Sequence, residues 1–159
     1  MSTNAGRLAN HIRRTVTGPM WHGPALGELL ADVSVDEARI RPIAGAHTIW
    51  ELVLHVTAWA DIARARLRGE RTGDPTAAED WPPPGHDASE WTAAVSQLEA
   101  SYKTLANATR ALDDAALDAK VNGLDYTVAT LLHGVVEHGT YHGGQIALLK
   151  RAMAAVAGA

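Results

Sequence analysis

Two histidines near the end of the chain have the spacing of a metal-binding pair. His138 and His142 are four residues apart, so on a helix of about 3.6 residues per turn both side chains project from one face, one turn apart. They also fall on the apolar stripe of their segment, whose members recur in steps of three and four. That stripe consists of Leu131, Val135, His138, His142, Gln145 and Leu149. Two neutral imidazoles arranged in this way can bind one metal ion without bending the helix.

A third histidine occupies the matching position in an earlier helical segment. His55 also lies on a stripe with steps of three and four, and it has apolar or aromatic neighbours one turn away on either side. This stripe consists of Leu52, His55, Trp59, Ile62 and Arg66. If both segments are helices of one bundle, His55, His138 and His142 would form a three-histidine site in its interior.

The chemistry of such a site follows from its ligands. Three protein ligands leave at least one coordination position open, which is the arrangement of catalytic rather than structural zinc. An open metal can lower the pKa of a bound water to about 7, or activate a thiolate. Imidazole ligands favour zinc, nickel, copper, iron or cobalt over magnesium or calcium. We expect zinc or nickel first, with iron and cobalt as alternatives. The opposing interpretation makes these histidines core residues that are hydrogen-bonded to the backbone or to neighbouring helices.

Helical periodicity defines the elements that would position these histidines. We expect helices over residues 5–16, 24–33, 48–68, 88–112 and 128–156. Two Gly-Pro pairs, at residues 18–19 and 23–24, break the first helix. Capping-box sequences, in which a short polar residue stands three before a glutamate, mark three further starts. These pairs are Ser34 with Glu37, Thr48 with Glu51, and Asp87 with Glu90, and Thr127 caps the final helix.

These helices favour an all-α fold in which a four-helix bundle has a broken first helix. Residues 69–87 show no helical pattern and contain three consecutive prolines; loops of this length are often functional or mobile. The final helix carries four glycines, each of which costs a helix about 1 kcal/mol relative to alanine. Glycines in that number predict the close approach of a neighbouring backbone or a ligand, and they are Gly134, Gly139, Gly143 and Gly144.

Composition excludes several classes of protein. With 159 residues, 47% of them hydrophobic, the chain is long enough for one well-buried domain, and we expect residues 1–159 to form it. A formal charge of −4 argues against nucleic acid as a partner. The chain has no cysteine, which excludes disulfides, thiolate ligands and a cysteine nucleophile. No signal-peptide pattern or membrane-spanning run is visible, so we expect a soluble, cytoplasmic protein without a membrane partner.

Two segments together resemble the DinB-like (YfiT-like) superfamily. Residues 48–56 (TIWELVLHV), followed by Trp59, are similar to its first ligand helix. Residues 137–146 (EHGTYHGGQI) are similar to its His-x-x-x-His-x-Gly-Gln-Ile segment. The resemblance extends to residues 21–24 (WHGP) and 42–47, so it covers most of the chain in the right order.

The resemblance implies an up-down-down-up four-helix bundle with a divalent metal held by His55, His138 and His142. It also implies a homodimer. Characterised relatives include metal-dependent enzymes that use a low-molecular-weight thiol, either as S-transferases or as a maleylpyruvate isomerase, while many others have no established activity. The family therefore indicates the site more securely than the reaction.

Five other residues have two interpretations each. His22 lies in the Trp-His-Gly-Pro break, at the surface or approaching the metal from the first helix. His47 lies on a loop surface or borders the cavity. Glu51 caps its helix, or orients His55 or acts as a base. Arg66 snorkels to the solvent or meets an anionic substrate. Gln145 follows His142 on the same stripe and is expected to make a hydrogen bond behind the ligands or between helices.

Three functions are compatible with this sequence. The first is an enzyme in which the metal activates an external thiol or a water for attack on a small electrophile. The second is a non-catalytic metal-binding protein, or a bundle that has lost its metal. The third is a dimeric interaction or stress-response bundle whose exposed apolar face serves association. A carboxylate near the metal would favour hydrolysis, and a basic patch at the cavity mouth would favour an anionic thiol such as bacillithiol, mycothiol or glutathione.

Overall fold

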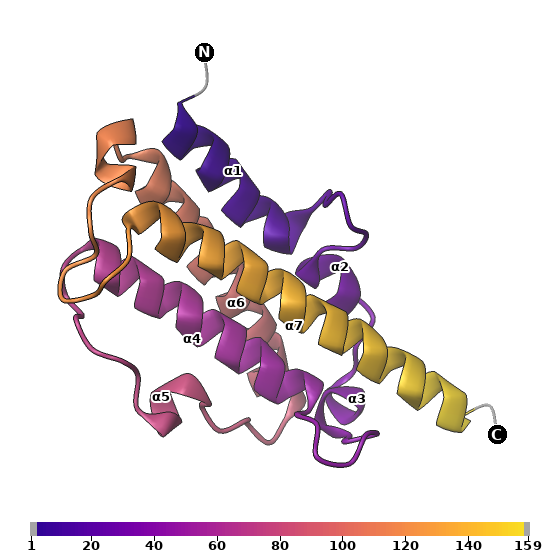
Figure 1. The fold of residues 1–159 in the computed structure, drawn as a ribbon. Coiled ribbons are helices and arrows are strands. Elements are labelled where there is room, and N and C mark those ends of the chain that lie inside the picture. Colours follow the sequence, from indigo (N-terminus) through magenta and orange to yellow (C-terminus); the bar gives the residue numbers. More distant parts are fainter. Residues whose placement is uncertain (1–2, 158–159) are drawn as a thin grey trace.

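The computed structural model describes residues 3–157, and its regular elements are helical (Figure 1). The four long helices are α1 (Asn4–Thr17), α4 (Ile49–Leu67), α6 (Ala88–Arg110) and α7 (Val128–Ala157). The shorter elements are α2 (Leu26–Leu30), α3 (Val35–Arg39), α5 (Ala77–Asp80) and the 3₁₀ helix η1 (Asp114–Leu117). No helix within residues 3–157 combines the length and apolar character needed to cross a membrane.

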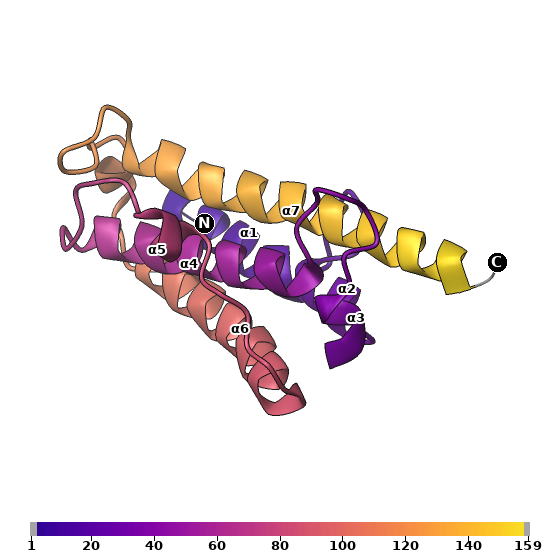
Figure 2. The same cartoon turned by 90° about the horizontal axis from the view of Figure 1, so that it is seen from below.

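The long helices pack in a ring in which each contacts two others. Helix α1 lies against α6 and α7, and α4 lies against the same two helices. Helices α1 and α7 run in one direction while α4 and α6 run in the other, which gives the expected up-down-down-up bundle (Figures 1 and 2). The predicted break in the first helix is also confirmed, because α1 ends at Thr17, the C-cap Gly18 has a φ of 64°, and helix resumes only at α2.

Reciprocal caps determine where the helices begin. At the start of α4, Thr48 Oγ1 accepts a hydrogen bond from Glu51 N at 3.2 Å, and Thr48 N donates to Glu51 Oε2 at 2.7 Å. Equivalent capping boxes begin α3, with Ser34 and Glu37, and α6, with Asp87 and Glu90. Thr127 Oγ1 accepts from Thr130 N at the start of α7. Each predicted start is confirmed, and a fixed start sets which residues of the helix face the interior.

The segment between α4 and α6 is long because these parallel neighbours require a crossover that returns along the bundle (Figures 1 and 2). The expectation of no helix in residues 69–87 is wrong for α5. Thr76 and Glu79 form a capping box there, with Thr76 N donating to Glu79 Oε2 at 2.8 Å. Arg71 also bonds Glu79 at 2.9 Å, and this bond is the main reason that the pKa of Glu79 falls to about 2. Helix α5 lies against α4 and so brings the crossover to the histidines.

The glycines of α7 differ in what surrounds them. A Cβ at Gly139 would lie 2.6 Å from Tyr102 Oη and 2.7 Å from Thr15 Cγ2, so any larger residue there would force a neighbouring side chain to move. A Cβ at Gly134 or Gly144 would meet no atom within 4 Å. The close approach expected of a neighbouring backbone is not found at these three glycines, because the atoms near Gly139 belong to side chains and Gly134 and Gly144 face open space.

Candidate metal centre

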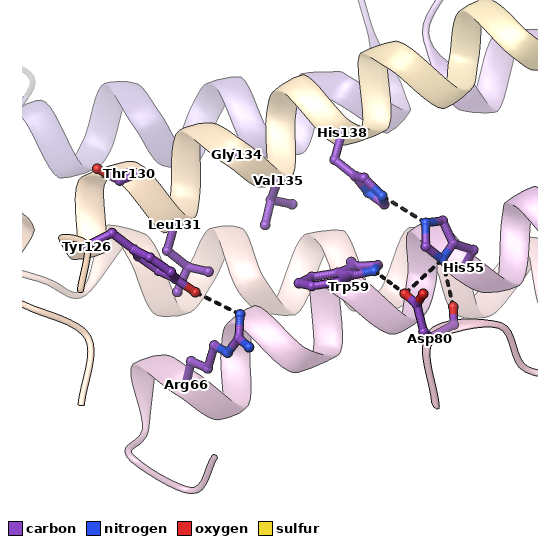
Figure 3. Close-up of a pocket in the computed structure, with 10 residues that line it drawn as sticks. All are labelled: His55, Trp59, Arg66, Asp80, Tyr126, Thr130, Leu131, Gly134, Val135 and His138. Carbon is purple, nitrogen blue, oxygen red and sulfur yellow. Dashed lines mark hydrogen bonds and ion pairs between the residues drawn. The ribbon is translucent and has the colours of Figure 1, made fainter. Parts of the chain in front are cut away.

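The side chains of His55, on α4, and of His138 and His142, on α7, converge with their Nε2 atoms facing one another. His138 Nε2 lies 2.9 Å from His55 Nε2 (Figure 3) and 3.1 Å from His142 Nε2. The three candidate ligand atoms lie within 4.8 Å of one another. Nitrogens that bind tetrahedral zinc through bonds of about 2.05 Å are about 3.3 Å apart. The three histidines singled out by helical periodicity therefore form a group that could hold a metal ion.

Oxygen acceptors hold the outer nitrogens of two of these rings. His55 Nδ1 lies 2.6 Å from the backbone oxygen of Asp80, and His142 Nδ1 lies 2.6 Å from Gln145 Oε1. A hydrogen bond to an oxygen acceptor requires an N–H, so each Nδ1 carries the proton of its neutral ring. The Nε2 atoms of His55 and His142 therefore present lone pairs to the centre of the group. The hydrogen bond expected of Gln145 is confirmed, and bonds of this kind orient metal-binding imidazoles.

The three neutral imidazoles carry too few protons for every close Nε2–Nε2 pair to be a hydrogen bond. His138 Nε2 carries at most one proton in the neutral ring, which it can donate to His55 or to His142 but not to both. A second proton on this ring is opposed, because burial, and then electrostatic repulsion among His138, His142 and His55 when protonated, lowers the pKa of His138 to about 3. Burial likewise lowers the pKa of His142. Inward-facing nitrogens that are short of protons suit a divalent cation.

The crossover supplies residues that cover His55. Trp81 stacks on His55 with ring centroids 3.8 Å apart, and His47 stacks on Trp81 at 3.6 Å. The carboxylate of Asp80 accepts a hydrogen bond from Trp59 Nε1 at 2.7 Å and lies 3.3 Å from His55 Nδ1 (Figure 3). Sequence analysis missed Asp80 and Trp81 because the crossover has no helical period. The one available signal was the capping box at the start of α5, which places both residues at its end.

A cavity of about 420 Å³ extends from the histidines between α4 and α7 (Figure 3). Volumes of this size are typical of small-molecule sites. Its middle is apolar and its two ends carry polar groups. The lining residues are His55, Trp59, Arg66, Asp80, Tyr126, Thr130, Leu131, Gly134, Val135 and His138.

Arg66 lies at the end of the cavity opposite the histidines (Figure 3). Its side chain is only 3% exposed, so the interpretation in which it snorkels to the solvent is wrong. Arg66 Nη1 donates to the hydroxyl of Tyr126 at 2.8 Å. Tyr126 is therefore a second cavity residue that sequence reasoning did not single out, since it lies in the loop before α7 and on no helical stripe.

The remaining histidines and Glu51 lie outside the group. Both carboxylate oxygens of Glu51 bond Arg41, at 2.8 and 3.0 Å, and one also caps α4, so its capping role is confirmed. His22 is exposed and lines a different cavity beside Tyr141, away from the three histidines. His47 is half-exposed on its loop, where it stacks on Trp81 and lines a separate cavity with Gln145. The other exposed histidines are His11, His86 and His133.

The fold and the site together define a helical-bundle protein with a candidate metal centre between two of its helices. A family model of the DinB superfamily matches residues 21–146, and the chain belongs to that superfamily. Searches of curated proteins and of solved structures found no significant match.

Proposed function

We propose that His55, His138 and His142 bind one divalent transition metal and that the protein is a metal-dependent enzyme. The observation that carries this proposal is the convergence of three Nε2 atoms, with the outer nitrogens of His55 and His142 held by Asp80 and Gln145. Zinc or nickel suits these ligands first, with iron and cobalt as alternatives. When bound, such an ion supplies Lewis acidity that makes a thiol or a water a stronger nucleophile at neutral pH.

The proposed reaction is the attack of a low-molecular-weight thiol on a small electrophile. A carbon–sulfur bond forms, the leaving group departs with the electrons of the broken bond, and the thiol proton passes to solvent. The thiol would come from a cosubstrate, since the chain has no cysteine. Attack by water is the second branch of the proposal. The first branch is preferred because the carboxylate of Asp80, although Asp80 lines the cavity, accepts a hydrogen bond from Trp59 and faces the outer nitrogen of His55, not the Nε2 atoms.

The residues of the chain position the reactants and exclude water. Trp59, Leu131 and Val135 form the apolar middle of the cavity, which keeps bulk water from the reacting end. Trp81 covers the ring of His55 and limits its rotation. Asp80 orients the same ring through its backbone oxygen, and its carboxylate favours the positive charge of an ion at the site.

Turnover can be tested with the zinc- or nickel-loaded protein, using glutathione, mycothiol and bacillithiol in turn with 1-chloro-2,4-dinitrobenzene. We expect metal-dependent product formation that is lost in His138→Ala and retained in His133→Ala, an exposed histidine on the same helix. Ester substrates test the water branch in parallel. A protein that binds the metal stoichiometrically but turns over none of these substrates would be a non-catalytic metal-binding bundle.

A second candidate function is a dimeric interaction bundle, and one surface favours it. Trp21 is 100% exposed and Tyr141 is 65% exposed. They border one apolar groove with Met20 and Val136. An exposed apolar patch of this kind is typical of an association surface, and we propose a homodimer formed through it. Analytical ultracentrifugation of the protein beside Trp21→Ser tests this, since a shift from dimer to monomer is expected in the variant.

A further inference from the structure

Arg66 is a buried cation placed on the same face of α4 as the proposed ligand His55. The two residues are eleven positions apart, which is about three helical turns, so their side chains project in nearly the same direction. A rise of about 1.5 Å per residue separates them by about 16 Å along the helix. The cavity connects them, with the histidines at one end and the guanidinium at the other (Figure 3).

The bonds of Arg66 leave part of its guanidinium without a partner. Its Nη1 donates to Tyr126 Oη at 2.8 Å, and its Nη2 donates to the backbone oxygen of Gly73 at 3.1 Å and to Asp74 Oδ1 at 3.4 Å. Arg66 Nε is buried and has no hydrogen-bond partner within residues 3–157. A guanidinium carries five N–H groups, so the acceptors found here do not exhaust it.

The charge of Arg66 is also poorly compensated. Asp74 Oδ1 is the nearest carboxylate oxygen, at 3.4 Å from Arg66 Nη2, and the Asp74 side chain is 92% exposed. Water screens so exposed a carboxylate strongly, whereas Arg66 itself is 3% exposed. A buried charge without a matching partner is unfavourable. The face of Trp59, 5.6 Å from the guanidinium carbon, offsets part of that cost through a cation–π contact.

We propose that this end of the cavity binds the carboxylate of an elongated small molecule. Arg66 binds the carboxylate, the body of the molecule lies against Trp59, Leu131 and Val135, and its reactive end lies at the histidines. A carboxylate suits the planar fork of an arginine, because two parallel N–H···O bonds can form. The proposal rests on the proposed function for the identity of the reactive end, but carboxylate binding by Arg66 stands without it.

Gly134 gives a means of filling the cavity without touching Arg66. It lies one turn before His138 on α7 and lines the cavity, and a Cβ there would meet no atom within 4 Å. Gly134→Leu therefore places a side chain in the cavity from a position where the added Cβ itself displaces no atom. Gly144→Leu is the matched control, since Gly144 lies on the same helix, is equally free of contacts and does not line the cavity.

The experiment measures binding of ω-phenylalkanoates, from phenylacetate to 6-phenylhexanoate, beside the corresponding neutral amides. Isothermal titration calorimetry is carried out on zinc-loaded and metal-free protein, with zinc content determined separately. We expect the best acid to bind about 10- to 100-fold more tightly than its amide, the range typical of a hydrogen bond to a charged group. The preference should disappear in Arg66→Gln, all binding should disappear in Gly134→Leu, and Gly144→Leu should bind as the unmodified protein does.

The outcomes separate the two proposals. Equal binding of acids and amides, no binding by any acid, or an acid preference that survives in folded Arg66→Gln would overturn carboxylate recognition. If Arg66→Gln fails to fold because its bonds to Gly73 and Tyr126 hold the loops, Gly134→Leu decides, and unchanged acid binding in that variant overturns the proposal. A protein that binds no zinc yet prefers acids through Arg66 would refute the metalloenzyme and support the carboxylate site.

Discussion

Glycine has opposite effects on the two faces of α7: on one face it permits close packing, and on the other it leaves a space. On the face toward α1 and α6, Gly139 lets Tyr102 and Thr15 approach to distances that no side chain would permit. On the face toward α4, Gly134 leaves space, and the cavity begins there. The buried polar groups on the two faces differ in whether they have hydrogen-bond partners. Tyr102, whose pKa is raised by complete burial, donates to the backbone oxygen of Val135 at 3.3 Å.

On the α4 face, by contrast, polar groups are buried without enough partners. His138 Nδ1 and Arg66 Nε have no hydrogen-bond partner among the described residues, and the inward Nε2 atoms of the three histidines have only one another. Native proteins rarely leave buried polar atoms unsatisfied, and the exceptions call for an explanation such as an ion or a ligand. Comparison of the two faces therefore shows which part of the bundle is packed for stability and which part is arranged to receive something.

The largest expected effect concerns pH and the face with the histidines. The folded pKa of His138 is about 3 and that of His142 is lowered from 6.5, mainly by burial. Unfolding therefore takes up protons below pH 6.5, so the metal-free protein should lose stability as the pH falls from 6.5 toward 3 and be independent of these groups above 6.5. Each histidine contributes at most about 1.4 kcal/mol per pH unit, reduced where solvent screens the site.

Urea unfolding of metal-free protein at several pH values measures this dependence. His138→Ala should flatten it, and His133→Ala, which removes an exposed histidine from the same helix, should leave it unchanged. Equal slopes for the three proteins would show that the imidazoles are not held neutral by the fold.

On the face of α7 toward α1 and α6, Gly139→Ala should destabilise the protein by about 1–3 kcal/mol, the usual cost of overpacking a core. The added Cβ would overlap Tyr102 Oη and Thr15 Cγ2, so a neighbouring side chain must move. Thermal and urea unfolding measure the change. Metal affinity should change little, since the overlap lies on the far side of α7, and a variant of unchanged stability would contradict the close approach.

Gln145→Leu should weaken metal binding by about 10- to 100-fold, the usual effect of losing a hydrogen bond behind a ligand. The substitution removes the acceptor that fixes the tautomer of His142, while keeping a side chain of similar size. Competition with a chromophoric chelator gives the affinity. An unchanged affinity would mean that His142 is oriented by packing alone.

The smallest change in stability is expected on the face of α7 toward α4. Gly134→Ala should stabilise the protein by up to about 1 kcal/mol, because alanine is the better helix former and the new methyl group meets no atom. Thermal unfolding beside Gly144→Ala, which should behave alike, measures it. Destabilisation at Gly134 alone would indicate that the space is smaller than the structure shows.

The sequence was sufficient for the four long helices and for the histidine group, because both depend on local periodicity, but it was not sufficient for α5. One stripe on α4 contains His55, and one on α7 contains His138, His142 and Gln145, so packing the two helices together brings these residues close. Asp80 and Trp81 could not be found in this way. They reach the site through a crossover whose path follows from the parallel arrangement of α4 and α6, which is a property of the whole fold.

Arg66 also shows that helical periodicity does not reveal contacts with distant parts of the chain. Its position on the α4 stripe was readable, but its burial depends on Tyr126 and Gly73, which come from two other parts of the chain. At the break in residues 18–24, by contrast, the sequence suggested a contact that the structure does not contain. Its histidine, His22, was a candidate for approaching the metal, and the loop instead carries it to the surface with Trp21.

The most direct test is the metal content of the purified protein beside the His138→Ala, His142→Ala double variant, by inductively coupled plasma mass spectrometry. His133→Ala is the matched control. We expect about one transition metal ion per chain in the unmodified protein and the control, and none in the double variant. No metal in any of the three proteins, even after zinc or nickel is offered, would contradict the metal centre and leave the histidines as packing residues.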